Sequence, residues 1–91
     1  MSEAVILCVD DEAIVLKSLS IELQNAFEDS YIYEFAESPD EALEIIEEFH
    51  EDKIRILLIV SDWLMPGMKG DEFLIRVHER YPNIVKIMLT G

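Results

Sequence analysis

Basic residues are scarce in this sequence. Seven lysines and arginines stand against twenty aspartates and glutamates, which gives the 91-residue chain a formal net charge of −13 at pH 7. Binding to nucleic-acid phosphates or to anionic lipid depends on lysine and arginine. The composition therefore argues against a nucleic-acid or membrane partner, and it favours cations and basic protein surfaces.

Cysteine and long apolar segments are also scarce. Cys8 is the single cysteine, so no disulfide can form within the chain. It lies inside an apolar run, where it fits a small core residue in a reducing cytosol, and we expect a cytoplasmic protein. We expect neither a signal peptide nor a transmembrane helix, because no basic segment or long apolar stretch precedes the first strand.

Repeats, low-complexity stretches and the common site motifs are missing too, and the length favours one small domain. There is no Walker or glycine-rich dinucleotide loop. Asp11 is followed by Glu12-Ala13-Ile14-Val15, which lacks the alternating oxygen ligands of an EF-hand. His50 and His78 have no metal-ligand partner at the usual spacing, and no nucleophile motif of a Ser-His-Asp triad is present. The aspartates remain as candidates.

What the sequence does contain is an alternation of strand and helix patterns. Apolar or β-branched runs predict strands at residues 4–9, 31–36, 56–60 and 84–89. Helical spacing predicts helices at residues 12–28, from 38 onward and at 70–80. Alternating strands and helices imply an α/β fold, here an open parallel sheet of about four strands with flanking helices.

The second helix has a marked start. In Ser38-Pro39-Asp40-Glu41, the serine suits the N-cap, the proline suits the first helical position and Glu41 completes a capping box. Four apolar positions then form the predicted buried stripe: Ala42, Leu43, Ile46 and Phe49.

Three aspartates lie where predicted strands end. Asp10 and Asp11 follow the first strand, Asp62 ends the third, and Thr90 follows the fourth. Functional residues of open parallel sheets gather at the carboxyl ends of the strands. If the first and third strands are neighbours, the carboxylates converge and repel one another unless a cation lies among them. Oxygen ligands of this kind suit Mg²⁺, so we predict a magnesium site.

Capping is the alternative for Asp10 and Asp11. A pair of aspartates after a strand can stabilise the positive end of the next helix, and for this pair alone capping explains the sequence as well as metal binding does. Asp62 taken alone fits a solvated loop carboxylate. The occurrence of these residues at separate strand ends, with Thr90 at a third, favours a functional site.

The whole chain resembles the receiver domain of two-component response regulators. Three stretches carry the resemblance: ILCVDDEAIV, LIVSDWLMPGMKGDEFL and IVKIMLTG. The resemblance implies a flavodoxin-like, doubly wound sheet with strand order 2-1-3-4-5. It also implies a signalling domain that is not a classical enzyme and whose partner is a histidine kinase or phosphotransfer protein.

The resemblance assigns roles to individual residues. Asp62 matches the phosphoacceptor, which attacks the phosphorus of a phosphohistidine on the partner. Asp11 matches a direct Mg²⁺ ligand, Asp10 a ligand acting through water, and the backbone carbonyl of Leu64 a further ligand. Thr90 matches the switch hydroxyl that hydrogen-bonds the phosphoryl group.

The sequence also departs from the family pattern. Residues 1–91 stop before the family's fourth helix and before its fifth strand with a lysine and a switch aromatic, so we expect an incomplete receiver domain. An apolar strand at residues 84–89 then lies at the sheet edge, where we expect pairing into a homodimer or larger oligomer.

Two other functions stay open. One is a protein-interaction module that keeps the receiver fold but is not phosphorylated. The other is a Mg²⁺-dependent phosphohydrolase with an aspartate nucleophile, which usually needs a second acid two residues after that nucleophile. Leu64 occupies that position, so this is the weaker alternative.

Overall fold

The structure is a computed structural model that describes residues 4–62 and 70–89. Strands and helices alternate along the chain as the sequence predicts. In order, they are β1 (Ala4–Val9), α1 (Ala13–Phe27), a short 3₁₀ turn (Glu28–Ser30), β2 (Ile32–Ala36), α2 (Pro39–Glu51), β3 (Arg55–Asp62), α3 (Gly70–Arg80) and β4 (Val85–Leu89). Every predicted element is present, and about half of the predicted bounds shift by one or two residues.

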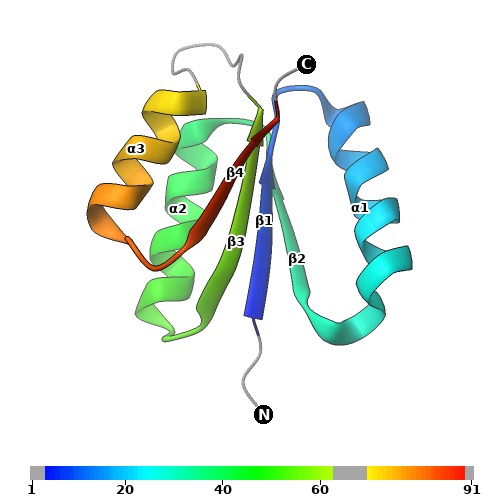
Figure 1. The fold of residues 1–91 in the computed structure, drawn as a ribbon, viewed down its shortest axis with the longest axis horizontal. Helices are drawn as coiled ribbons and strands as arrows, with labels where there is room; N and C mark the ends of the chain where they lie inside the picture. Colours follow the sequence, from blue (N-terminus) through cyan, green and yellow to red (C-terminus); the bar gives the residue numbers. More distant parts are fainter. Residues whose placement is uncertain (1–3, 63–69, 90–91) are drawn as a thin grey trace.

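The four strands form one parallel sheet in the order β2-β1-β3-β4. Figure 1 shows α1 alone on one face of this sheet and α2 with α3 on the other. The predicted α/β class is confirmed, and so is the adjacency of the first and third strands on which the convergence of the aspartates depends. All carboxyl strand ends meet at one edge of the molecule because every pairing is parallel.

The core has two unequal parts, one on each face of the sheet. On the α2 and α3 face, Val5, Leu7 and Val9 of β1 pack with buried Phe73 and Val77 of α3. On the α1 face, the buried residues are Ile6, Cys8 and Leu16. Successive side chains of a strand point to opposite faces, so β1 contributes to both parts and is buried on both sides, as its continuous apolar run predicts.

One extra residue in β3 changes which side chains face the larger core. Val5 pairs with Ile56, but the next residue, Ile6, pairs with Leu58, so Leu57 has no partner position on β1. Such a bulge shifts the two-residue alternation of the strand. As a result, Ile56 and Ile59 both pack in the larger core although they are three residues apart. The same bulge determines to which face of the sheet the following side chains of β3 point, up to Asp62.

The start of α2 agrees with the sequence except for one hydrogen bond. The Ser38 side chain accepts a hydrogen bond from the backbone N–H of Glu41 at 3.1 Å, and Pro39 opens the helix. The Glu41 carboxylate, however, accepts from the N–H of Glu37 at 3.4 Å rather than from that of Ser38. The reciprocal half of the predicted capping box is therefore displaced by one residue, from the N–H of Ser38 to that of Glu37.

The end of α1 differs from the prediction as well. The helix stops at Phe27, and Glu28 adopts a positive φ of 52° as the chain turns into the 3₁₀ segment. The Tyr33 hydroxyl donates to the Glu28 carbonyl oxygen at 2.8 Å and fastens this turn to β2. Phe27, the last residue of the helix, is exposed, and its ring meets the ring of Tyr31 edge-on.

Candidate functional site

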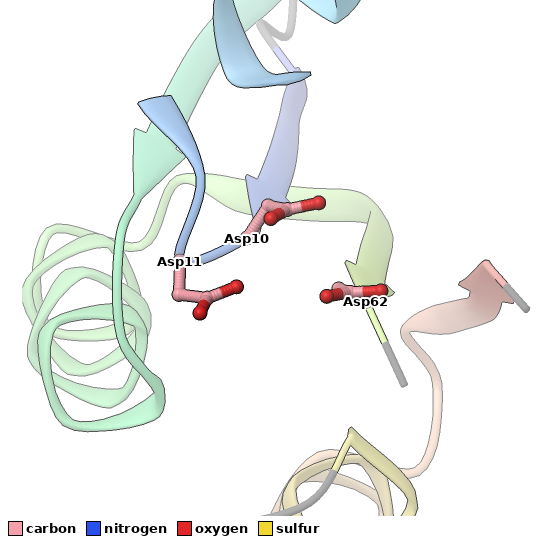
Figure 2. Close-up of side chains that lie close together, drawn as sticks. All are labelled: Asp10, Asp11 and Asp62. Carbon is pink, nitrogen blue, oxygen red and sulfur yellow. The ribbon is translucent and has the colours of Figure 1, made fainter. Parts of the chain in front are cut away.

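The three candidate aspartates converge at the carboxyl edge of the sheet. Val9 of β1 lies opposite Ser61 of β3, so the residues that follow each of them, Asp10 and Asp62, come side by side. Figure 2 shows the side chains of Asp10, Asp11 and Asp62 around one small space. One carboxylate oxygen from each residue lies within 4.8 Å of those from the other two. The predicted convergence is present in the structure.

The turn after β1 fixes the position of Asp10. Its backbone N–H donates to the Ala36 carbonyl oxygen at 3.0 Å and extends the pairing with β2 by one residue. Its Oδ1 atom accepts a hydrogen bond from the N–H of Glu12 at 2.9 Å, which bends the chain toward α1. The N-cap of α1 is Glu12, which makes no side-chain capping bond. Asp10 therefore holds the turn before the helix rather than the first turn of the helix itself.

The electrostatic environment of Asp10 is unfavourable to its charge. The residue is 5% exposed, and burial raises the pKa of its carboxyl group. The N–H of Glu12 opposes this rise, while the negative charges of Asp62 and Asp11 add to it. A buried carboxylate with two like charges beside it is stabilised by a bound cation.

The donor set fits Mg²⁺. All three ligands are carboxylate oxygens, and oxygen atoms on opposite sides of an octahedral Mg²⁺ ion lie about 4.2 Å apart. The three carboxylate oxygens lie within 4.8 Å of one another, which is close enough for them to share one such ion. Asp10 is buried, Asp62 is partly exposed and Asp11 is exposed, so the site opens to solvent. Water can then complete the coordination shell, as is usual for this ion.

Two predicted site residues, Leu64 and Thr90, lie outside the described residues. Conversely, the structure adds two groups that the sequence did not single out. One is the Glu12 N–H that orients Asp10. The other is the hydroxyl of Ser61, which is fully buried and donates to the Asp62 carbonyl oxygen at 3.1 Å. An aspartate two residues before the N-cap of a helix is a sequence signal for the hydrogen bond from Glu12, whereas nothing in the sequence marks the role of Ser61.

Comparison with known proteins decides the family. Residues 6–91 match the model of the family described as response regulator receiver domain. The chain belongs to this family. The predicted resemblance is confirmed, and the four-stranded parallel sheet agrees with the CheY-like fold of solved receiver domains.

Individual relatives of this receiver domain are similar over different lengths. The hydrogenase transcriptional regulatory protein HoxA of Cupriavidus necator is 39% identical over 59 residues, which are 57% of this chain and 12% of that protein. A CheY-like receiver domain protein of Methanospirillum hungatei is 33% identical with a TM-score of 0.82, over 99% of this chain and 66% of that one. The receiver domain of an HD domain-containing protein of Pseudomonas fluorescens is 29% identical with a TM-score of 0.82, over 98% and 65%. The chain thus spans a small part of the curated relative and about two thirds of these structures.

Family membership carries several general properties. Receiver domains are signalling domains rather than classical enzymes, and accepting a phosphoryl group is their standard function. They generally bind Mg²⁺ in an acidic pocket, and they interact with histidine kinases or phosphotransfer proteins. In the part of the chain that the structure describes, no helix has the length and apolar character to cross a bilayer.

Proposed function

We propose that Asp62 of this chain accepts a phosphoryl group from a phosphohistidine on a kinase or phosphotransfer protein, in a site where Asp10 and Asp11 hold Mg²⁺. The observation that carries this proposal is the meeting of three carboxylates from β1 and β3 within 4.8 Å. A cluster of like charges at the carboxyl edge of a parallel sheet is costly without a cation, and that edge is the usual place for function.

Each residue has a distinct task in the proposed transfer. One oxygen of Asp62 attacks the phosphorus, and the bond between phosphorus and the imidazole nitrogen breaks with its electron pair moving to the ring. The departing imidazole nitrogen takes up one proton from the solvent, so the products are an aspartyl phosphate and a neutral histidine, and charge and atoms balance. Asp62 is partly exposed, which leaves room for the approaching phosphohistidine.

Asp10 and Asp11 are the proposed cation ligands. Asp10 is buried and held by the Glu12 N–H, so it is suited to orienting a water ligand of the ion; Asp11 is exposed and suited to direct binding. Bound Mg²⁺ supplies positive charge that offsets the charge on the phosphoryl oxygens. The backbone carbonyl of Leu64 and the hydroxyl of Thr90 are the further ligand and the switch hydroxyl in this proposal.

The setting of the domain is proposed on the same basis. Residues 1–91 act as one receiver unit in the cytoplasm, which suits its single buried, reduced cysteine. The net charge of −13 favours a partner with a basic docking surface and disfavours nucleic acid.

We further propose that two copies associate through β4, because three apolar side chains of that strand are exposed: Val85, Ile87 and Leu89.

A phosphodonor experiment tests the proposal. The protein is incubated with acetyl phosphate and Mg²⁺ and followed by intact mass spectrometry. We expect one phosphoryl adduct in the wild type and none in Asp62→Asn. Asp29→Asn, which removes an exposed aspartate from the 3₁₀ turn far along the chain from the site, is the matched control and should be modified like the wild type.

Each other outcome contradicts the proposal in a defined way. An adduct that persists in Asp62→Asn would mean that another residue is the acceptor. A folded wild-type protein that gains no adduct would support the interaction module. Continuous release of inorganic phosphate without an adduct would support the phosphohydrolase.

A further inference from the structure

A cavity lies at the end of the molecule opposite the three aspartates. Its volume is about 410 Å³, and it is formed by the last turn of α2, the start of β3 and the connection from α3 to β4. In Figure 1 these segments meet at the amino ends of the strands, away from the edge at which β1 and β3 end. Its size falls within the range of small-molecule sites, about 300–1,000 Å³.

The floor of this cavity is apolar. Ile46 of α2 and Ile56 of β3 are buried, while Ile54 and Ile84 are partly buried. The ring of Tyr81, also partly buried, forms one wall. Such a surface suits an aliphatic or aromatic group, because burial of apolar area from both partners is favourable.

The rim of the cavity is basic in a strongly acidic protein. Arg55, Arg80 and His50 line it, whereas none of its lining residues is acidic. Twenty of the 91 residues are aspartate or glutamate and three are arginine, so two of the three arginines are found at this one cavity. The rim therefore has the charge that a carboxylate or similar anion requires.

Contacts between side chains hold one side of the rim in place. The Arg80 guanidinium carbon lies 5.5 Å from the centre of the Tyr81 ring, and the His50 ring meets that ring edge-on at 5.1 Å. Arg80 also forms an ion pair with Glu47 at 3.0 Å, so part of its charge is already neutralised. No ion pair of Arg55 is found among the described residues. Arg55 is thus the main candidate for pairing with an anion.

Stabilisation of helix ends explains part of this arrangement but not all of it. His50 and Arg80 lie in the last turns of α2 and α3, where positive charge interacts favourably with the helix dipole. Arg55, in contrast, is the first residue of β3, and no helix dipole accounts for its position at the mouth of an apolar cavity.

We propose that this cavity is a second binding site, which takes a small organic anion with an apolar or aromatic body and one carboxylate. The body occupies the isoleucine floor beside Tyr81, and the carboxylate pairs with Arg55 and the outer side of Arg80. Arginine suits this role because its guanidinium can donate two parallel hydrogen bonds to one carboxylate. The site is independent of Asp62 and of the phosphoryl transfer proposed above.

Phenylacetate is a suitable probe because it combines an aromatic ring with one carboxylate. Phenylacetamide keeps the ring but is neutral, and acetate keeps the carboxylate but lacks the ring. Each is titrated into ¹⁵N-labelled protein while the backbone amide shifts are recorded. We expect saturable phenylacetate shifts around Ile54, Tyr81 and Ile84, with affinity at least about tenfold weaker for phenylacetamide and for acetate. Arg55→Gln should weaken phenylacetate binding by about tenfold, and Arg55→Lys by less, because it keeps the charge but loses the paired donors.

The matched control is Arg76→Gln, which removes an exposed arginine of α3 that does not line the cavity and should leave binding unchanged. Equal binding of phenylacetate and phenylacetamide would overturn the proposal, since the basic rim would then have no role. Shifts centred on Asp62, or no saturable shift at all, would overturn it too. Shifts at the cavity that depend on protein concentration without any probe would show that a second copy of the chain occupies it instead.

Discussion

At the scale of single residues, the location of Asp10 can be predicted from the sequence, whereas its environment is seen only in the structure. Its place after an apolar strand, together with Asp62 and Thr90 at other strand ends, predicts a site at the carboxyl edge of the sheet. Its burial and its hydrogen bond from Glu12 follow from the geometry of the turn, which a linear pattern does not specify. The same is true of the buried Ser61, which lies between Val9 of β1 and Met88 of β4. Cys8 is the simpler case: burial raises the pKa of its thiol to about 11, which agrees with the core position that its apolar neighbours predict.

The Asp10→Asn substitution should stabilise the metal-free protein at pH 7 by about 1 kcal/mol, the usual size of a single-residue effect. The folded-state pKa of Asp10 is raised above its ordinary value of 3.8, so the ionised carboxylate costs stability. This cost is absent below pH 3.8 and develops as the pH rises from there through the raised folded-state pKa. Asparagine keeps the oxygen that accepts from Glu12, so the turn is preserved. Urea unfolding in the presence of a chelator measures the difference.

A pH series supplies the control for this prediction. The advantage of the asparagine variant should vanish at pH 3.5 and be complete at pH 7. Added Mg²⁺ should reverse the order, because a ligand that binds the folded wild type more tightly stabilises it more. A variant that is less stable than the wild type at pH 7 without metal would contradict the account of Asp10.

At the scale of secondary structure elements, the sequence predicts best those features that a few neighbouring residues determine. The bounds of α3 and the start of α2 agree with the sequence because helical spacing and the Ser38-Pro39 pair act within a few residues. The bulge at Leu57 was not predicted, since a run of five apolar residues shows no alternation in which an extra residue could be detected. Phe27 follows the apolar spacing of α1 but is 44% exposed, so the spacing alone does not show where burial ends.

The N-cap of α2 offers a test at this scale. Ser38→Ala removes the oxygen that accepts from the N–H of Glu41, and we expect a loss of about 1 kcal/mol in the free energy of unfolding. Ser20→Ala is the matched control, because Ser20 lies within α1 and its hydroxyl donates to a helix carbonyl that is already engaged in the helix. That change should be neutral or slightly stabilising, since alanine has the higher helix propensity. Equal losses in chemical denaturation of the two variants would argue against the capping role.

At the scale of the whole molecule, the two faces of the sheet are covered unequally. Among the described helices, α2 and α3 cover one face, whereas α1 alone covers the other and lies over the side of β1 and β2 (Figure 1). On β4, Val85, Ile87 and Leu89 are 54%, 46% and 37% exposed and alternate with partly buried residues. In the parallel register, Val85 and Ile87 lie opposite Leu58 and Val60, which pack in the core on the α1 side, so the exposed row extends that face. The sequence predicted the edge position of this strand, and the register in the structure identifies the face.

This uncovered row underlies the predicted self-association. An apolar edge strand is a template for pairing with another chain, and burying its side chains is favourable at about 25 cal/mol per Å². The net charge of −13 opposes association, but its effect is screened beyond about 8 Å at physiological salt. We expect a dimer or larger oligomer at micromolar concentration in light scattering, and a shift to monomer in Ile87→Lys.

The control for self-association is Ile21→Lys, which places the same charge at an exposed isoleucine of α1 and should leave the assembly intact. A wild-type protein that remains monomeric across the concentration range would mean that β4 is not an association surface. Equal dissociation by both lysine variants would point to a general charge effect instead.

The central claim is that Asp62 works as a phosphoryl acceptor inside a cation site shared with Asp10 and Asp11. The most direct test is the rate of phosphoryl incorporation from acetyl phosphate, measured by intact mass over a range of Mg²⁺ concentrations for the wild type and for Asp11→Asn. The account predicts a saturable dependence on Mg²⁺, no incorporation with a chelator present, and a requirement for at least about tenfold more Mg²⁺ in the variant. Incorporation at Asp62 that proceeds equally with a chelator, or that is unchanged in Asp11→Asn, would contradict it.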